Sequence, residues 1–107
     1  LRPGQFVLAQ TMETFTLPDT IAAEFRLKSS RARSGLDQAL AVWCDPGWHG
    51  SVLTLELRNN RQLHPVPLWP GMRIGQMIFH RMEKSPLKSY RLTGRYNGDQ
   101  VVTASRG

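Results

Sequence analysis

The chain has 107 residues, with 14 Lys and Arg against 8 Asp and Glu and a formal net charge of +6. This length predicts a single domain, and a hydrophobic fraction of 40% excludes a chain that is disordered throughout. No run of about 18 apolar residues that could form a membrane-spanning helix is present, and no secretory signal is predicted. The excess positive charge favours polyanionic partners, namely nucleic acid, nucleotide phosphates or anionic membrane, without choosing among them.

Turn residues divide the chain into short segments that are typical of an all-β domain. Seven prolines and nine glycines recur at the spacing expected of a sandwich or barrel of short strands. Strands are predicted at residues 5–11, 13–17, 21–27, 39–44, 51–58 and 73–80. We expect residues 1–107 to form one domain, in which the polar and basic residues 85–107 are a mobile C-terminal arm.

The cysteine and histidine content predicts neither a disulfide within the chain nor a metal centre. The three histidines never stand at ligand spacing, and the single Cys44 cannot build a zinc site of the Cys-x-x-Cys kind. The His-x-Glu and Pro-Cys-x-x-Cys signature of zinc nucleobase deaminases is missing. One cysteine fits a reducing compartment, so we expect a cytoplasmic protein.

Cations and hydroxyls gather between residues 26 and 36, in the segment Arg-Leu-Lys-Ser-Ser-Arg-Ala-Arg-Ser-Gly-Leu. This segment is expected to form one helical turn, capped by the hydroxyl of Ser29 or Ser30 and ended by Gly35. Phosphate oxygens bind hydroxyls, backbone N–H groups and cationic side chains. A solvated basic loop explains the composition equally well, and no Walker-type glycine loop supports an ATPase-like site.

A carboxylate in an otherwise apolar strand, Glu56, is the second candidate. Leu53, Leu55 and Leu57 share one face of the predicted strand, and Glu56 lies on the other face. In that position Glu56 either faces water or stands at a cleft where it can transfer protons.

Motifs along almost the whole chain resemble the dCTP deaminase branch of the trimeric dUTPase-like superfamily. They are LRPGQF at residues 1–6, SSRARSGL at 29–36, DPGWHG at 45–50, LELRN at 55–59, PGMRIGQ at 70–76, RYNG at 95–98 and SR at 105–106. A single motif of this kind is weak, since Asp-Pro-Gly is a common turn. Their shared order and spacing carry the resemblance.

The resemblance implies an all-β fold, a distorted β-barrel or jelly roll of the dUTPase-like (β-clip) type with few or no helices. It also implies a homotrimer with active sites between subunits, and a further N-terminal portion that we expect this chain to lack. The implied activity is zinc-independent deamination of dCTP to dUTP, with Mg²⁺ accompanying the triphosphate. A dUTP diphosphatase, alone or combined with deamination, is one alternative. A non-catalytic module that binds nucleotides or nucleic acid on the same fold is another.

The resemblance also implies roles for individual residues. Glu56 matches the general acid/base, Arg33 an arginine near the catalytic site, and Ser29 a hydroxyl that contacts the triphosphate or the catalytic water. The expected substrate-binding residues are Lys28, Ser30, Asp45, Gln76, Tyr90, Arg95 and Gln100. Asp45 would orient water in a diphosphatase, and Tyr90 and Arg95 lie on the arm that closes over phosphates. The sequence departs from the family where residues 37–41 replace a His-x-Thr-Ala stretch, and at Lys28, Arg95 and Gln100.

Overall fold

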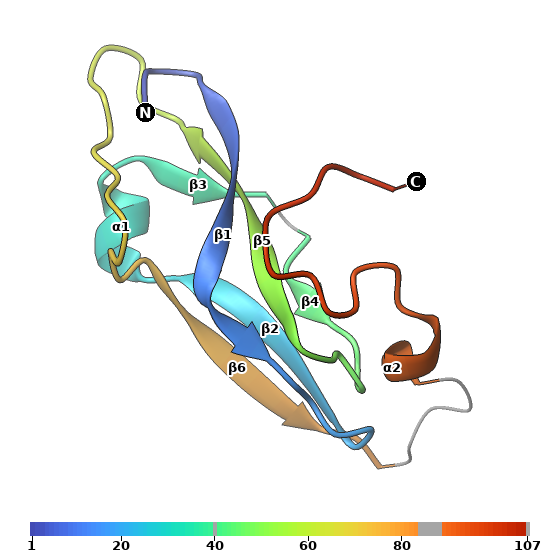
Figure 1. The fold of residues 1–107 in the computed structure, drawn as a ribbon. Coiled ribbons are helices and arrows are strands. Elements are labelled where there is room, and N and C mark those ends of the chain that lie inside the picture. The colour runs from blue at the N-terminus through green and yellow to red at the C-terminus, as the bar shows by residue number, and fades with distance from the viewer. Residues whose placement is uncertain (40, 84–88, 107) are drawn as a thin grey trace.

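The computed structural model describes residues 1–39, 41–83 and 89–106. These residues form β1 (Phe6–Phe15), β2 (Ile21–Leu27), α1 (Ser29–Arg33), β3 (Leu36–Gln38), β4 (Trp43–Cys44), β5 (Ser51–Asn59), β6 (Gly75–Arg81) and α2 (Tyr90–Thr93). Two antiparallel sheets result, ordered β1-β5-β3 and β4-β2-β6, as Figure 1 shows. The predicted all-β class is confirmed, although the described residues do not close a barrel. No helix among them is long and apolar enough to cross a membrane.

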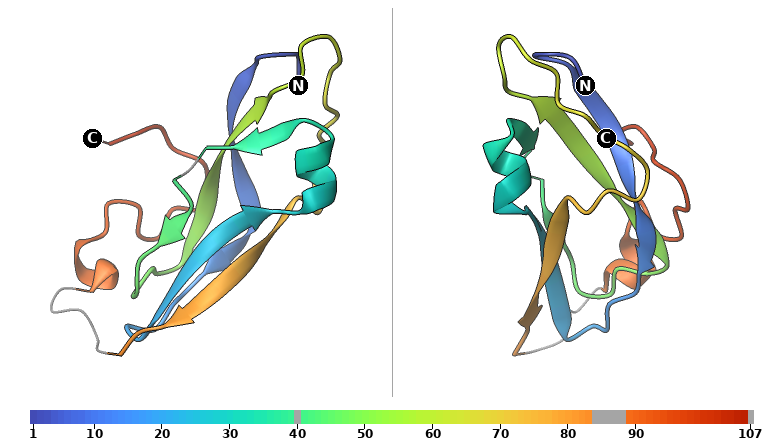
Figure 2. Two further views of the ribbon diagram at one scale, coloured as in Figure 1. Left: turned by 180° about the vertical axis from the view of Figure 1, so that it is seen from behind. Right: turned by 90° about the vertical axis from the view of Figure 1, so that its left-hand side faces the viewer.

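The core lies between the two sheets, which face each other in the right-hand view of Figure 2. It is built from Leu17, Ala23, Phe25, Leu36, Cys44, Trp48, Leu53, Leu55, Leu57 and Val66. The central strand β5 shows the predicted alternation, because its three core leucines are at most 6% exposed. Glu56 lies between two of them and is half-buried on the other face of the strand.

Two predicted strand boundaries are wrong, for different reasons. The strands predicted at 5–11 and 13–17 are largely parts of one strand, β1 (Phe6–Phe15), whose register against β5 shifts between Gln10 and Thr14. Such a bulge resets the alternation of side chains, so the sequence pattern shows a break where the backbone continues. The strand predicted at 39–44 is reduced to β4, and β3 precedes it, with Leu40 outside the described residues. β3 pairs with β5 whereas β4 pairs with β2, so the chain changes sheets within this segment.

The helical turn predicted after Ser29 and Ser30 is present as α1, but it begins at Ser29 and its predicted cap is wrong. The N-cap is Lys28, and no side chain accepts a hydrogen bond there. Ser29 and Ser30 are the first two helical residues and are exposed, so their hydroxyls are not used to begin the helix. Gly35 ends the turn with φ of +100°, a conformation that side chains disfavour.

Residues 89–106 return to the body of the protein along β5 and the turn before it. The Tyr90 ring stacks on Trp48 at 5.0 Å between centroids, and the backbone N–H of Val52 donates to the carbonyl oxygen of Asp99 at 2.7 Å. Gly47, with φ of +86°, packs against Ser89. The mobility expected of this arm stays a prediction, and residues 85–88 and 107 lie outside the described part.

Candidate active site

A buried amide holds the carboxylate of Glu56. The side-chain Nε2 of Gln38, on β3, donates to Oε2 of Glu56 at 2.8 Å. The backbone N–H of Glu56 donates in return to Oε1 of Gln38 at 3.0 Å. Because the oxygen of the amide already accepts this hydrogen bond, its NH₂ group must face the carboxylate. The result is a half-buried carboxylate in a fixed orientation, which is what a general acid/base requires.

The role of Gln38 was missed by sequence reasoning. Gln38 lies in the segment that departs from the family pattern, and 18 residues separate it from Glu56. The antiparallel pairing of β3 with β5 places Gln38 opposite Leu57 and beside Glu56. No local sequence pattern predicts such a contact. It depends on the pairing of β3 with β5, and the pairing partner of a three-residue strand cannot be found from the residues around it.

One group of predicted site residues gathers around α1. The backbone N–H of Lys28 donates to the carbonyl oxygen of Ile74 at 2.8 Å, which fixes the start of the helix beside the entry to β6. Ser29, Ser30 and Arg33 follow on α1 and are exposed. Gln76 is exposed on β6 opposite Arg26, two residues before Lys28. The structure therefore brings five predicted residues to one end of the sheet: Lys28, Ser29, Ser30, Arg33 and Gln76.

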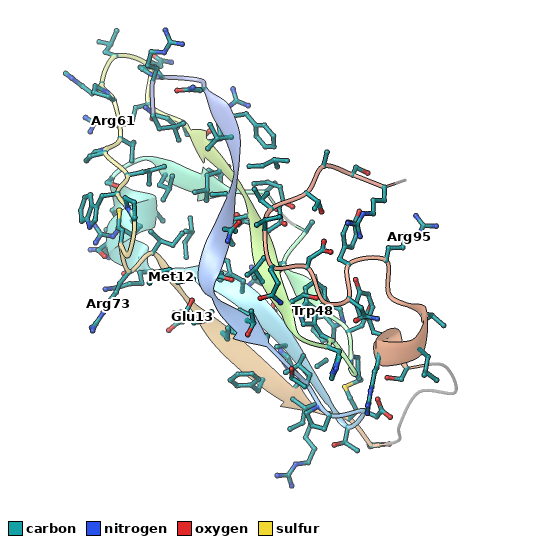
Figure 3. The ribbon with its side chains drawn as sticks, in the orientation of Figure 1. Met12, Glu13, Trp48, Arg61, Arg73 and Arg95 are labelled. Atoms are coloured by element: carbon teal, nitrogen blue, oxygen red, sulfur yellow. The ribbon has the colours of Figure 1, made fainter. Side chains whose placement is uncertain are left out.

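A second group lies on the C-terminal arm and the turn beneath it. Tyr90 accepts a hydrogen bond at its hydroxyl from the backbone N–H of Tyr96 at 3.3 Å, and burial raises the pKa of the Tyr90 phenol. The Gln100 amide donates to the carbonyl oxygen of Gly50 at 2.7 Å. Asp45 and Arg95 are both exposed, and in Figure 3 Arg95 extends from the arm away from the body.

The two groups lie on opposite sides of the chain. α1 stands at one side of the sheets and α2 with the arm at the other, in Figure 1 and in the left-hand view of Figure 2. Figure 3 repeats this separation for charged side chains, because Arg73 stands near α1 and Arg95 on the arm. The predicted residues therefore do not converge on one point within a single chain.

A cavity of about 650 Å³ lies between β1 and residues 68–75. Its lining is mainly apolar and includes Leu55 and Leu57 of β5. Of the predicted site residues, only Lys28 lines it. Glu56 belongs to the opposite face of β5 from these two leucines, so the cavity and the carboxylate are separate features of the chain.

A family model described as dCTP deaminase-like matches residues 1–82. The chain belongs to this family. A dUMP-forming dCTP deaminase of Pseudarthrobacter chlorophenolicus is 49% identical to it over 110 residues, which cover 99% of the chain and 56% of the relative. The corresponding protein of Clavibacter michiganensis is 48% identical and 54% covered, and that of Mycobacterium tuberculosis is 44% identical and 57% covered. The chain thus spans about half the length of these curated relatives.

The names of these dCTP deaminases correct one expectation from the sequence. They state dUMP as the product. The prediction that dCTP is deaminated to dUTP is therefore wrong. Forming dUMP from dCTP requires two hydrolyses, because both the amine at C4 and two phosphoryl groups must leave. A site of this kind has to activate water in two places.

Two further observations bear on nucleophiles and metals in this deaminase-like chain. Cys44 is a free, fully buried thiol. Burial, and to a smaller extent the charge of the nearby Asp45 carboxylate, raises the pKa of the Cys44 thiol to about 11. The thiol therefore stays protonated at neutral pH and is a poor nucleophile. Within residues 1–39, 41–83 and 89–106, no group of three or more His, Cys, Asp or Glu side chains could hold a metal ion.

Proposed function

We propose that this chain carries the acid–base centre of a dUMP-forming dCTP deaminase and acts in pyrimidine deoxynucleotide metabolism. The observation that supports this most directly is the Glu56 carboxylate fixed by Gln38, in a chain that belongs to the dCTP deaminase-like family. The reaction consumes two waters and releases ammonia and diphosphate. The free thiol of Cys44 supports a reducing, cytoplasmic setting.

In the deamination step, Glu56 takes a proton from the water that attacks C4 of the cytosine ring. It then returns a proton to the departing amine, so that a single carboxylate serves as base and as acid. The hydrogen bond from Gln38 occupies Oε2, which leaves Oε1 for the water. Ser29 is proposed to hold this water, and Arg33 to stabilise the negative charge that develops nearby.

The phosphate chain is proposed to lie along exposed donors. Lys28 and Ser30 bind phosphate oxygens from α1, and Arg95 and Tyr90 bind them from the arm. Asp45, exposed in the turn after β4, orients the second water for attack on the phosphate nearest the sugar. Gln76 and Gln100 contact the nucleotide. For Gln100 this requires the amide to leave the carbonyl oxygen of Gly50, to which it donates here.

The assembly is proposed to be a homotrimer with active sites between subunits. The separation of the α1 group from the arm group supports this, because residues on opposite sides of one chain can meet only across an interface between chains. Light scattering at micromolar concentration is expected to give three times the 12.1 kDa mass of the chain. A folded monomer under these conditions would contradict the proposal.

Magnesium is proposed to enter the site with the triphosphate and not through protein ligands. The described part of the chain has no cluster of three or more His, Cys, Asp or Glu side chains that could hold the ion without the triphosphate. Activity is therefore expected to fall when Mg²⁺ is withheld and to survive a zinc-selective chelator. Metal analysis of the purified protein checks the same point, since stoichiometric zinc would overturn it.

The proposed function is tested by incubating the protein with dCTP and Mg²⁺ and identifying the products by chromatography. We expect dUMP, ammonia and diphosphate in equal amounts. A parallel incubation with dUTP shows whether the phosphate step proceeds without deamination. Accumulation of dUTP from dCTP would show that the protein deaminates the base without hydrolysing the phosphate chain. Salt-dependent DNA binding without dCTP turnover would instead favour a non-catalytic module.

A further inference from the structure

Arg31 fastens α1 to a segment far away in the sequence. Its Nε donates to the carbonyl oxygen of Arg73 at 3.0 Å, across 42 residues. Its guanidinium carbon lies 5.5 Å from the centre of the Trp69 ring. Both partners belong to residues 68–74, the last part of the connection from β5 to β6 (Figure 1). One half-buried side chain thus makes two different contacts with this segment.

These contacts matter because α1 is short and lies at the surface. The helix has five residues and none of them is buried. A helix this short is not stable alone, so its position depends on contacts with the rest of the protein. The backbone hydrogen bond from Lys28 to Ile74 fixes its first turn. Arg31 supplies the side-chain attachment, one residue after Ser30.

The chemistry of both contacts suits arginine in particular. The planar guanidinium can lie over an aromatic face while an N–H in its own plane donates to a carbonyl. Trp69 is 52% exposed and gains partial cover from this cation. A lysine ammonium can reach one partner or the other, but it cannot match both with a single plane.

We propose that Arg31 is a positioning residue, which holds α1 so that Lys28 and Ser30 present their donors to the phosphate chain of the substrate. This inference rests on the proposed function for the identity of the substrate. Arg31 acts through the segment 68–74 and does not itself touch the nucleotide. Loosening α1 should therefore weaken binding of the phosphate chain most. It should affect the deamination step less, through Ser29 and Arg33 on the same helix.

The test compares Arg31→Met and Arg31→Lys in the full chain. Methionine keeps an apolar stem but loses both contacts, and lysine keeps the charge. Arg81→Met is the matched control, because Arg81 is exposed on β6 at the end that pairs with Ile21, away from α1. The measurements are KM and kcat for dCTP, the Kd for inorganic tripolyphosphate, and hydrogen–deuterium exchange of residues 28–34 without ligand.

For Arg31→Met we expect KM and the tripolyphosphate Kd to rise about 10-fold, since one charge-assisted hydrogen bond and one cation–π contact are lost. The fall in kcat should be smaller than the rise in KM. Exchange of residues 28–34 should become faster. Arg31→Lys should recover part of the loss, and Arg81→Met should match the unmodified protein. Trp69→Leu, which keeps Arg31, should give a smaller rise of the same kind.

The outcomes separate this inference from the proposed function. If the unmodified protein converts no dCTP, the proposed function fails, and tripolyphosphate binding and exchange still decide the role of Arg31. Unchanged KM, unchanged Kd or unchanged exchange in Arg31→Met would overturn the positioning role. So would a fall in kcat at constant KM, or a failure of the unmodified protein to bind tripolyphosphate.

Discussion

Replacing Glu56 with glutamine is expected to reduce dCTP turnover by about 10²–10⁴-fold, the usual effect of losing general acid–base catalysis. Glutamine has nearly the shape of glutamate, and its side-chain oxygen can still accept the hydrogen bond that Gln38 donates to Oε2. It cannot accept the proton of the attacking water. The folded structure should persist because the leucines of β5 pack on the opposite face. The measurement pairs the rate of dCTP turnover with the Kd for dCTP.

The Kd should change little, because the proposed phosphate contacts come from α1 and the arm. Glu83→Gln is the matched control, since Glu83 is exposed beyond the end of β6 and the same charge is removed. If Glu56→Gln binds and turns over dCTP as the unmodified protein does, Glu56 is a surface carboxylate. The deaminase proposal then loses the residue on which it depends most.

Replacing Asn59 with alanine is expected to lower the free energy of unfolding by about 3 kcal/mol. The Asn59 side chain is fully buried. It donates to the carbonyl oxygens of Leu1 at 3.0 Å and His64 at 2.9 Å, and accepts from the backbone N–H of Arg61 at 2.8 Å. Alanine removes the Asn59 partner of the His64 carbonyl oxygen and of the Arg61 N–H and opens a small cavity, and each lost hydrogen bond carries a cost. The carbonyl oxygen of Leu1 still accepts from the backbone N–H of Val66 at 2.9 Å.

Urea unfolding measures this loss, and Asn60→Ala is its control. Asn60 is the next residue, is exposed, and makes a single side-chain hydrogen bond, to Asp37 at 3.0 Å. Its loss should cost less than about 1 kcal/mol. Equal destabilisation by the two substitutions would contradict this prediction. It would show that the buried hydrogen bonds of Asn59 contribute no more to the free energy of unfolding than the exposed one of Asn60.

Local patterns predicted the parts of the site that depend on local structure. The alternation in β5 was sufficient to place Glu56 opposite the core leucines. The helical turn before Gly35 was also found, although its N-cap is Lys28 and not the predicted hydroxyl. Sheet membership was not predictable in the same way. β3 and β4 lie within nine residues and belong to different sheets, and the pairing partner of each strand is distant in the sequence.

The contacts that orient the site residues were also beyond the sequence. Gln38 reaches Glu56 through the pairing of β3 with β5, and Arg31 reaches Trp69 and Arg73 through the position of a long connection. Each depends on side chains brought together from distant segments. The product named for the relatives was not predicted from the sequence either, because the motifs did not show whether hydrolysis of the phosphate chain accompanies deamination.

The C-terminal arm packs directly against the main chain at Gly47. A Cβ at this position would meet the Ser89 hydroxyl and the Asp19 carboxylate, two groups that are themselves hydrogen-bonded. The fit of the arm therefore cannot be adjusted by changing the side chain at position 47. It can be adjusted at Ser89 or through the stack of Tyr90 on Trp48, while the turn at Gly47 keeps its shape.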